Sequence, residues 1–328
     1  MVAMRTFLKT VTAACAALSL FGAATCHAQD FPVRPVRLVT IFAPGSASDI
    51  NARFLAGKMT PILGQTVIVD NKPGGGGLLA TRDVLRAQPF GYSFLYTTPE
   101  IVGNAFAYKE PGYKMEDFAV MGPFGLGSYG LIINNEKVPA KTVAELVAYA
   151  KANPGKLNYG SLGPTAANTI LAERFKQAAG IQMEGIPFKG GDPLAVSLLA
   201  GDIHVYFPTF FTAMQRMKSK QITGLAATSL ERMKAMPDLP TLKEMGYADM
   251  VLTYWSATFV PAATPRPALL KLRDALRQVT ASAETRELLA KNAIDTWSGT
   301  VEQFADFIRK EGADLQADYR RLNIPLLD

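Results

Sequence analysis

Two stretches of small and hydroxyl-bearing residues, each between a predicted strand and a predicted helix, are well suited to bind a ligand. The first is PGSASD at residues 44–49, and the second is GSLGPTAAN at residues 160–168. The first N–H groups of a helix lack acceptors within the helix, and the aligned peptide dipoles add partial positive charge there. Small residues let an anion approach these amides closely. Ordinary capping by Ser48 and Thr165 also explains each junction, but two junctions from separate domains would hold one anion from both sides.

The glycine run at residues 74–77 does not have the pattern of a nucleotide site. A phosphate-binding loop ends in Gly-Lys-Ser or Gly-Lys-Thr, whereas Gly77 is followed by Leu78. The dinucleotide fingerprint fails as well, because Leu79 stands where its third glycine belongs. We therefore expect a tight turn before a helix and no nucleotide cofactor.

Residues suited to catalysis do not form a coherent set. Ser128 lies in a sequence similar to a nucleophile elbow, but Leu126 replaces its first glycine. His204 has strand-like neighbours, which favours a structural role, and no carboxylate pair has the spacing of an acid and a base. We expect a protein that is not an enzyme and that holds no metal or cofactor.

The N-terminus predicts export. Arg5 and Lys9 precede an apolar run at residues 11–24, and Ala28 provides a small residue for cleavage, so we interpret residues 1–28 as a signal peptide and expect a periplasmic protein. A membrane anchor, or lipidation at Cys26, is the alternative. The mature chain would contain no cysteine, and its 32 basic and 28 acidic residues leave a net charge of +4. That mild, dispersed charge suits a small anion and argues against nucleic acid.

Alternating strands and helices predict an α/β fold with largely parallel sheets. The first block has predicted strands at 36–42, 67–70 and 93–97 and helices at 50–62 and 78–87. The second has strands at 130–133, 158–161, 186–188 and 203–207 and helices at 143–152 and up to 179. Residues 225–228 are interpreted as a crossing back, and the chain from 265 onward as helical. We predict one domain from residues 29–124 and 226–328 and another from 125–225; one larger sheet is the alternative.

Five motifs along the chain resemble those of the Bug-type periplasmic receptors of tripartite tricarboxylate transport systems. They lie at residues 31–39, 42–49, 69–77, 180–190 and 237–242. Each motif is loose alone, but their order and spacing over the mature chain are specific. The resemblance implies a two-domain periplasmic-binding-protein fold, a type II Venus flytrap, with the ligand cleft between the domains. It also implies a monomer that captures a small organic carboxylate and delivers it to a membrane permease.

The resemblance further implies that residues on the loops facing the cleft bind the ligand. These candidates are Phe42, Ser46, Ala47, Ser48, Asp49, Thr98, Gly163, Thr165, Ala166, Ala167, Asn168, Phe188, Pro208, Thr209 and Trp255. One carboxylate is expected against the amides of residues 46–48 and 165–167.

The sequence departs from the family at two positions of this predicted site. Pro208 stands where many members have an aspartate, which argues against an amino-acid ammonium, and Asn168-Thr169 replaces a frequent serine–histidine pair. Six aromatic residues lie in or near the predicted loops, and we expect at least half of them to be core residues: Phe42, Phe188, Phe207, Phe210, Tyr254 and Trp255. If two or more line the cleft, an aromatic acid such as a terephthalate-like compound is favoured over a C4–C6 dicarboxylate. A sensory binding subunit with the same fold and a periplasmic hydrolase or decarboxylase using His204 are the alternative functions.

Overall fold

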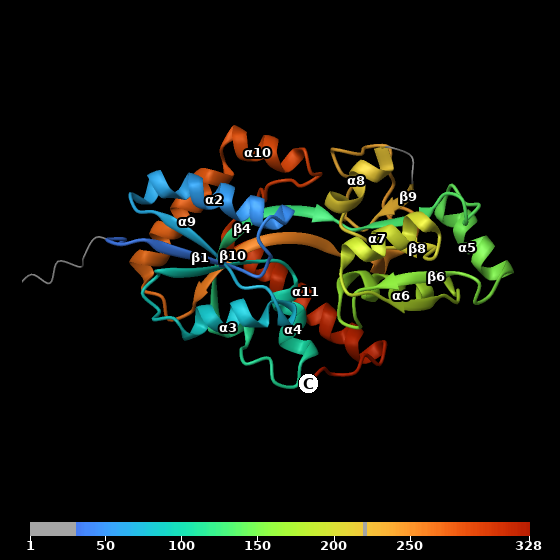
Figure 1. Ribbon diagram of the computed structural model, residues 1–328, viewed down its shortest axis with the longest axis horizontal. Coiled ribbons are helices and arrows are strands. Elements are labelled where there is room, and N and C mark those ends of the chain that lie inside the picture. The colour runs from blue at the N-terminus through green and yellow to red at the C-terminus, as the bar shows by residue number, and fades with distance from the viewer. Residues whose placement is uncertain (1–30, 219–221) are drawn as a thin grey trace, which may run out of the picture.

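The computed structural model describes residues 31–218 and 222–328, which form two α/β lobes, each around its own five-stranded sheet (Figure 1). The predicted signal peptide at residues 1–28 lies outside the described residues. Within the described part of the chain, no helix is both long enough and apolar enough to cross a membrane.

The sheet of the first lobe is mixed, with strand order β2-β1-β3-β10-β4. Strands β1, β2 and β3 are parallel, and β10 runs antiparallel to both β3 and β4. The strands are β1 (Val36–Thr40), β2 (Val67–Asn71), β3 (Ser93–Thr97), β4 (Phe118–Ser128) and β10 (Thr253–Pro261).

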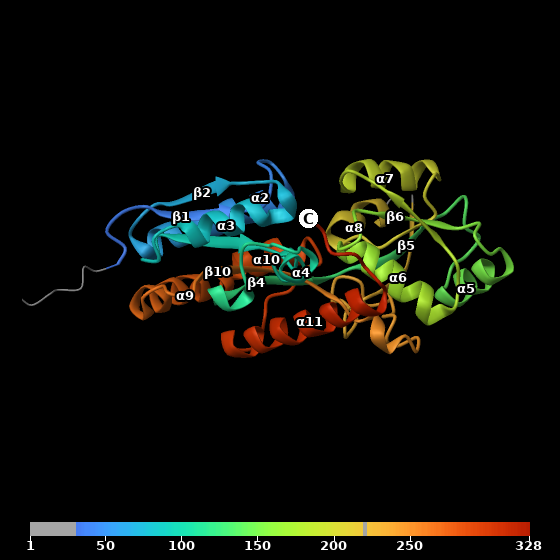
Figure 2. The same cartoon turned by 90° about the horizontal axis from the view of Figure 1, so that it is seen from below.

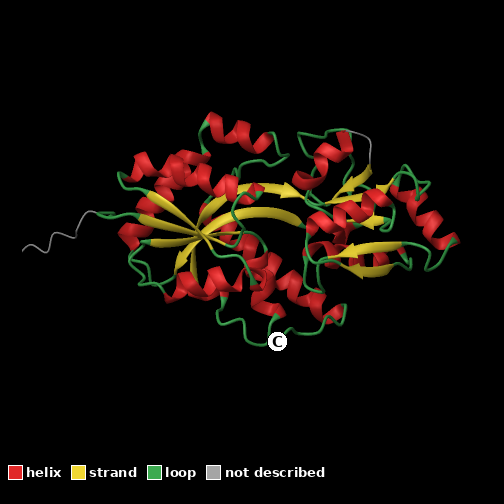
Figure 3. Ribbon diagram, viewed as in Figure 1, coloured by secondary structure: helices red, strands yellow, loops and turns green. Residues whose placement is uncertain are grey.

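Helices cover both faces of this sheet because alternate strand residues point to opposite faces (Figure 3). Val36 and Leu38 pack with the helices of one face, whereas Val39 packs with those of the other. The first face carries α2 (Ala47–Leu63), α9 (Arg266–Thr280) and α10 (Ala283–Ala290); the second carries α3 (Leu78–Arg86), α4 (Glu100–Ala107) and α11 (Val301–Arg321). Short 3₁₀ turns lie at Gly75–Gly77, directly before α3 as expected of the glycine run, and at Met115–Asp117.

The sheet of the second lobe has the strand order β7-β6-β8-β5-β9. Strand β6 is parallel to β7 and β8, and β5 is antiparallel to β8 and β9. The strands are β5 (Gly130–Asn134), β6 (Asn158–Ser161), β7 (Glu184–Pro187), β8 (Val205–Tyr206) and β9 (Ile222–Ala227). The helices are α5 (Val143–Ala152), α6 (Ala167–Ala179), α7 (Gly191–Ala200) and α8 (Phe210–Lys218), and a 3₁₀ turn lies at Ala248–Met250.

The chain passes between the lobes twice, through the ends of β4 and β10. Tyr129 alone separates β4 from β5, close to the predicted boundary at 124/125. The interpretation of residues 225–228 as the return crossing is wrong, because β9 pairs with β5 inside the second sheet. Leu242, Met250 and Leu252 also pack in the second lobe's core. We therefore propose a domain division whose second crossing follows Leu252 instead of residue 225.

Helix α11 belongs to the first lobe but extends along the second. Figure 2 shows it running beneath the boundary toward α6. Its buried side chains Phe304 and Ile308 pack in the first lobe, and Leu315 and Tyr319 pack with Ile170 of α6. This helix and the two crossing strands therefore connect the lobes, and Ala293 of the first lobe shares a further apolar cluster with Phe210 and Met233 of the second.

Candidate ligand-binding site

A cavity of about 400 Å³ lies between the two lobes. The first lobe lines it with α4, the C-terminal segment and one face of α11, and the second lobe lines it with the loop before α6 and the start of that helix. Its lining residues include Gly76, Pro99, Glu100, Asn104, Tyr108, Tyr129, Leu162, Gly163, Pro164, Thr165, Ala166, Ala167, Ile170, Glu311, Leu315 and Leu327. Four predicted site residues are in this set: Gly163, Thr165, Ala166 and Ala167.

The start of α6 offers unpaired N–H groups to this cavity. Its N-cap is Ala166, whose side chain cannot accept a hydrogen bond, so the capping by Thr165 that we considered does not occur. The N–H of Ala166 donates to the Gly163 carbonyl at 3.2 Å. Among the described residues, the N–H groups of Ala167 and Asn168 have no acceptor. These two amides, with the positive end of the helix dipole, form a site for an anion.

The start of α2 is similar but lies outside the wall of that cavity. Ser46, not Ser48, is its N-cap, and the Ser46 hydroxyl accepts a hydrogen bond from the Asp49 N–H at 3.2 Å. Within the described residues, the N–H group of Ser48 has no acceptor. The structure therefore places the two predicted anion sites on facing lobes without joining them in one cavity.

Two tyrosines connect the α2 start to the cavity. The Tyr254 hydroxyl is hydrogen-bonded to the Ser48 side chain, and the Tyr254 ring lies edge-on to that of Tyr129, with centroids 6.2 Å apart. Tyr129 itself lines the cavity. Burial raises the pKa of both phenols, so both stay neutral and can act as hydrogen-bond donors.

Asp49 holds the α2 loop in place. Its buried carboxylate accepts hydrogen bonds from the Gly45 N–H at 2.8 Å, Arg53 Nε at 2.9 Å and Asn71 Nδ2 at 2.7 Å. Burial opposes ionisation, but the hydrogen bonds from Asn71, Gly45 and Arg53 and the charge of Arg53 outweigh it and lower the pKa of Asp49. Asp49 therefore serves as an ionised positioning group for the start of α2.

Replacing Asp49 with asparagine is expected to lower the free energy of unfolding by about 1–3 kcal/mol, because a buried amide cannot accept all of these hydrogen bonds. The folded-state pKa of Asp49 is depressed, so its stabilising contribution is present above its ordinary pKa of 3.8 and is lost as pH falls through the lowered value. Urea unfolding at pH 7 and pH 3 measures both effects. Equal stability of D49N and the parent protein at pH 7 would contradict this role.

The remaining predicted residues are distributed between the cleft loops and the core. The Thr98 hydroxyl is buried and donates to the Glu100 carboxylate, and Asn168 Nδ2 donates to the Gly160 carbonyl at 2.8 Å. The Pro208 carbonyl accepts from the Gly130 N–H at 2.9 Å, and Thr209 forms a bridge with Tyr129. These contacts place the four residues at the junctions between strands and loops.

Three of the six aromatic residues, Trp255 among them, are core residues. Trp255, Phe207 and Phe210 are at most 1% exposed. Phe42 and Phe188 are half-buried, with Phe42 packed edge-on against Tyr96 and Phe188 packed against the core beneath α7. Trp255 therefore lies behind the cavity wall, where its indole Nε1 donates to the Glu311 carboxylate at 2.6 Å.

Two acidic residues of the cavity, Glu100 and Glu311, were missed by sequence reasoning. None of the residues that line this cavity is a lysine or arginine. Burial raises the pKa of Glu311 to about 7, although the hydrogen bonds from Trp255 and the Thr253 N–H lower it, as does the charge of Arg174. Sequence spacing could have identified Glu311, because it continues the apolar stripe Phe304, Ile308, Leu315 of α11.

The only histidine after residue 30 is remote from this cavity. His204 Nδ1 lies 2.6 Å from Oδ1 of Asn158, at the start of β6, whereas the cavity loop leaves the other end of that strand. Burial, with the charges of Lys137 and Lys156, lowers the pKa of His204. This geometry supports the structural role expected of His204.

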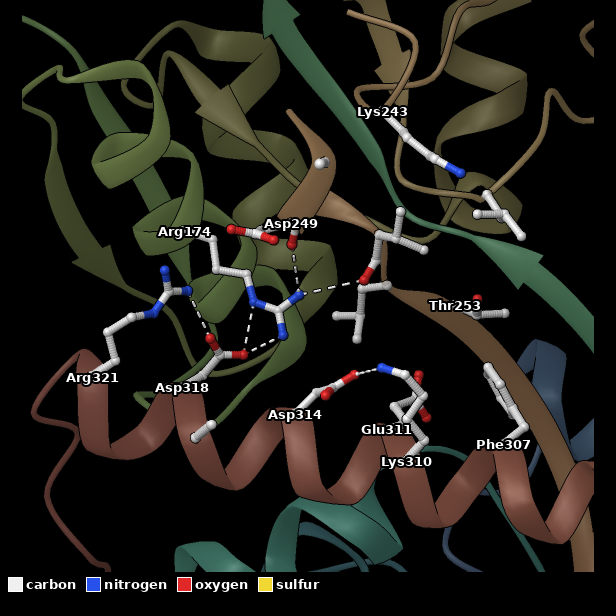
Figure 4. Close-up of a pocket in the computed structure, with 15 residues that line it drawn as sticks. Arg174, Lys243, Asp249, Thr253, Phe307, Lys310, Glu311, Asp314, Asp318 and Arg321 are labelled. Carbon is white, nitrogen blue, oxygen red and sulfur yellow. Dashed lines mark hydrogen bonds and ion pairs between the residues drawn. The ribbon is translucent and has the colours of Figure 1, made fainter. Parts of the chain in front are cut away.

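A second cavity, of about 600 Å³, lies on the other side of Glu311 and Leu252, between α11, α6 and the crossing to β10 (Figure 4). Arg174 of α6 spans it: its Nε donates to Asp318 of α11 at 2.8 Å, and Nη1 donates to the carbonyls of Asp249 and Val251. Arg321 donates to the other Asp318 oxygen at 2.8 Å. We use the name hinge cluster for Arg174, Asp318 and Arg321, which join the two lobes beside β10.

Comparisons with known proteins agree with this architecture. Residues 51–322 match the model of the tripartite tricarboxylate transporter family receptor. The UPF0065 protein in the gbd 5′ region of Cupriavidus necator is 33% identical over 93% of this chain and 94% of its own, and protein BugT of Bordetella pertussis is 27% identical over 88% and 89%.

Solved structures show the same fold. The periplasmic binding protein BugD is 30% identical, with a TM-score of 0.76 over 90% of this chain and 99% of its own. An R. palustris protein solved with adipate is 25% identical, with a TM-score of 0.80 over 90% of this chain and 100% of its own. The predicted two-domain periplasmic-binding-protein fold is confirmed. The chain therefore belongs to the tripartite tricarboxylate transporter family of receptors, whose members are periplasmic binding proteins.

Proposed function

We propose that this protein captures a small organic carboxylate in the cavity between its lobes and carries it to the membrane permease of a tripartite tricarboxylate-type transporter. The observation that carries the proposal is the start of α6, where Ala167 and the adjacent Asn168 have unpaired N–H groups. Ala167 lines the cavity, and none of the described residues lining it is a lysine or arginine. A carboxylate can accept hydrogen bonds from both amides, and the helix dipole supplies the favourable field.

Closure would bring the start of α2, with the unpaired Ser48 N–H, onto the same ligand. Contacts made only in the closed state favour that state, since a ligand shifts an equilibrium by its difference in affinity. The Tyr254 contact with Ser48 supports this arrangement, because it links the α2 start to Tyr129 in the cavity wall.

The ligand class we propose is an aromatic mono- or dicarboxylate or a C4–C6 dicarboxylate. The rings of Tyr108 and Tyr129 support the aromatic class, since they line the cavity. The relative solved with adipate supports the C6 dicarboxylate class. Pro208, where many members have an aspartate, carries no charge and does not line this cavity, so an amino-acid ammonium would have to meet Glu100 or Glu311 instead.

A thermal-shift screen followed by calorimetry tests this proposal. The panel contains adipate, malate, citrate, benzoate and terephthalate, with glucose and putrescine as a neutral and a cationic control. At least one acid is expected to raise Tm, by an amount that grows with the ratio of its concentration to Kd. Stabilisation by glucose or putrescine and by none of the acids would overturn the proposed ligand class.

A non-catalytic monomer fits this role, and the geometry of His204 gives the alternative enzyme no support. A hydrolase or decarboxylase would need a base within hydrogen-bond reach of the bound ligand, whereas His204 lies at the opposite end of β6.

A sensory binding subunit is the other alternative, and it would have the same ligand site. Co-purification with a permease or a sensor kinase from the native membrane separates these two uses.

A further inference from the structure

Glu311 is the side chain that lies between the ligand cavity and the hinge. It lines both the cavity between the lobes and the second cavity beside β10. Its Oε2 accepts the Trp255 indole N–H at 2.6 Å, and the carboxylate also accepts from the Thr253 N–H. Because both donors belong to β10, the carboxyl group is held against that strand, although Glu311 as a whole is only partly buried.

Among the described residues, Glu311 forms no ion pair, although Lys243 and Lys310 also line the second cavity. The charge of Arg174 of α6 lowers the pKa of Glu311, but that guanidinium is paired with Asp318. Asp314, on the next turn of α11, is negative and pairs with Lys310 at 2.6 Å. Each of these two charges therefore has a partner other than Glu311.

The groups that face Glu311 from the ligand cavity do not supply positive charge either. Tyr129, from the junction of β4 and β5, stays neutral because burial raises the pKa of its phenol, and Glu100 of α4 is acidic. A ligand carboxylate at the start of α6 would therefore share the cavity with the Glu311 carboxylate. Two like charges in one low-dielectric cavity repel, and protonation of one of them removes the repulsion.

We propose that the receptor takes up one proton from solvent at Glu311 when it binds its carboxylate, so that the ligand is held beside a neutral carboxylic acid. The inference rests on the proposed function. The balance is simple: the ligand anion enters, one proton passes from solvent to Glu311, and the charge of the cavity is unchanged. Neutral Glu311 can still accept the Trp255 N–H, and its new O–H can donate toward the ligand.

The unliganded protein is poised for this uptake. Burial raises the pKa of Glu311 to about 7, so its carboxyl group is about half protonated at pH 7 before ligand arrives. A bound anion raises that pKa further. Linkage then requires Kd to increase, by up to about tenfold for each pH unit above 7, until the pKa of the complex is reached.

Calorimetry in buffers of different ionisation enthalpy tests the uptake directly. The probe is the acid of highest affinity among adipate, malate, citrate, benzoate and terephthalate, titrated in phosphate, HEPES and Tris at pH 8. The expected result is uptake of up to about 0.9 proton per ligand and a Kd several-fold higher at pH 8 than at pH 7. Glu311→Gln should remove both effects, because the amide keeps an acceptor for Trp255 and cannot titrate.

Asp314→Asn is the matched control, since Asp314 lies one turn further along α11 and lines only the hinge side. Because the charge of Asp314 raises the pKa of Glu311, D314N should keep the proton uptake but shift its midpoint to lower pH. In the parent protein, the indole N–H signal of Trp255 should titrate near pH 7 without ligand and at higher pH with it. Binding without proton uptake, or uptake that survives in E311Q, would overturn this inference alone. Binding of no acid would overturn the proposed function, and this inference with it.

Discussion

Ala167→Pro is expected to weaken binding of the carboxylate by about ten- to a hundredfold while the protein remains folded. Ala167 is the first residue of α6, where proline is tolerated because the N–H it removes has no acceptor within the helix. Ala166 has φ −71° and ψ 140°, a conformation that proline accepts in the residue before it. A hydrogen bond to a charged group contributes about 1.5–3 kcal/mol, which corresponds to this loss of affinity.

The control for this variant is Ala283→Pro, at the first position of α10. Its N-cap Ser282 has φ −70° and ψ 147°, nearly the same backbone, and Ala283 is exposed on a helix that does not line the cavity. Both variants should keep Tm within a few degrees of the parent, and calorimetry should show weaker binding in A167P only. Unchanged affinity in A167P would exclude the Ala167 amide as a ligand donor.

Arg174→Met is expected to lower the free energy of unfolding by about 3–5 kcal/mol. Removing one partner of a buried ion pair leaves the other charge poorly compensated in a low-dielectric environment. Arg174 and Asp318 are buried, and the guanidinium also satisfies the carbonyls of Asp249 and Val251. Arg321 would be the remaining partner of Asp318, from a more exposed position. Urea unfolding followed by circular dichroism measures the loss.

The double variant R174M/D318L separates the cost of an unpaired charge from the value of the pair. It should recover much of the loss, because replacing both members of a buried pair by apolar groups is often neutral or stabilising. Arg309→Met is the control, since Arg309 forms an exposed pair with Asp306 on the same helix and should change stability by at most about 1 kcal/mol. A loss below 1 kcal/mol in R174M would contradict a structural role for the hinge cluster.

Much of the local structure could be predicted from the sequence. The predicted bounds of β3 and α5 agree with those observed, and the start of α6 lies within the predicted loop–helix junction. Local signals decide these elements: a β-branched or aromatic run ended by turn residues, and a threonine followed three residues later by glutamate at the start of α5. The return crossing was predicted too early in the chain, because the apolar sequence of β9 does not show which of the two sheets the strand joins.

The sequence by itself determined the fold class and the two strand–loop–helix junctions, since these depend on residues close together in the chain. Only the tertiary structure decided which helix amides remain unpaired and which side chains enclose the cavity. Tyr129, Glu311 and Leu327 come from three distant segments, and nothing in their local sequence indicates a shared cavity. The acidity of Glu311 was decided in the same way, because burial and the two hydrogen bonds from β10 exist only after α11 packs against that strand.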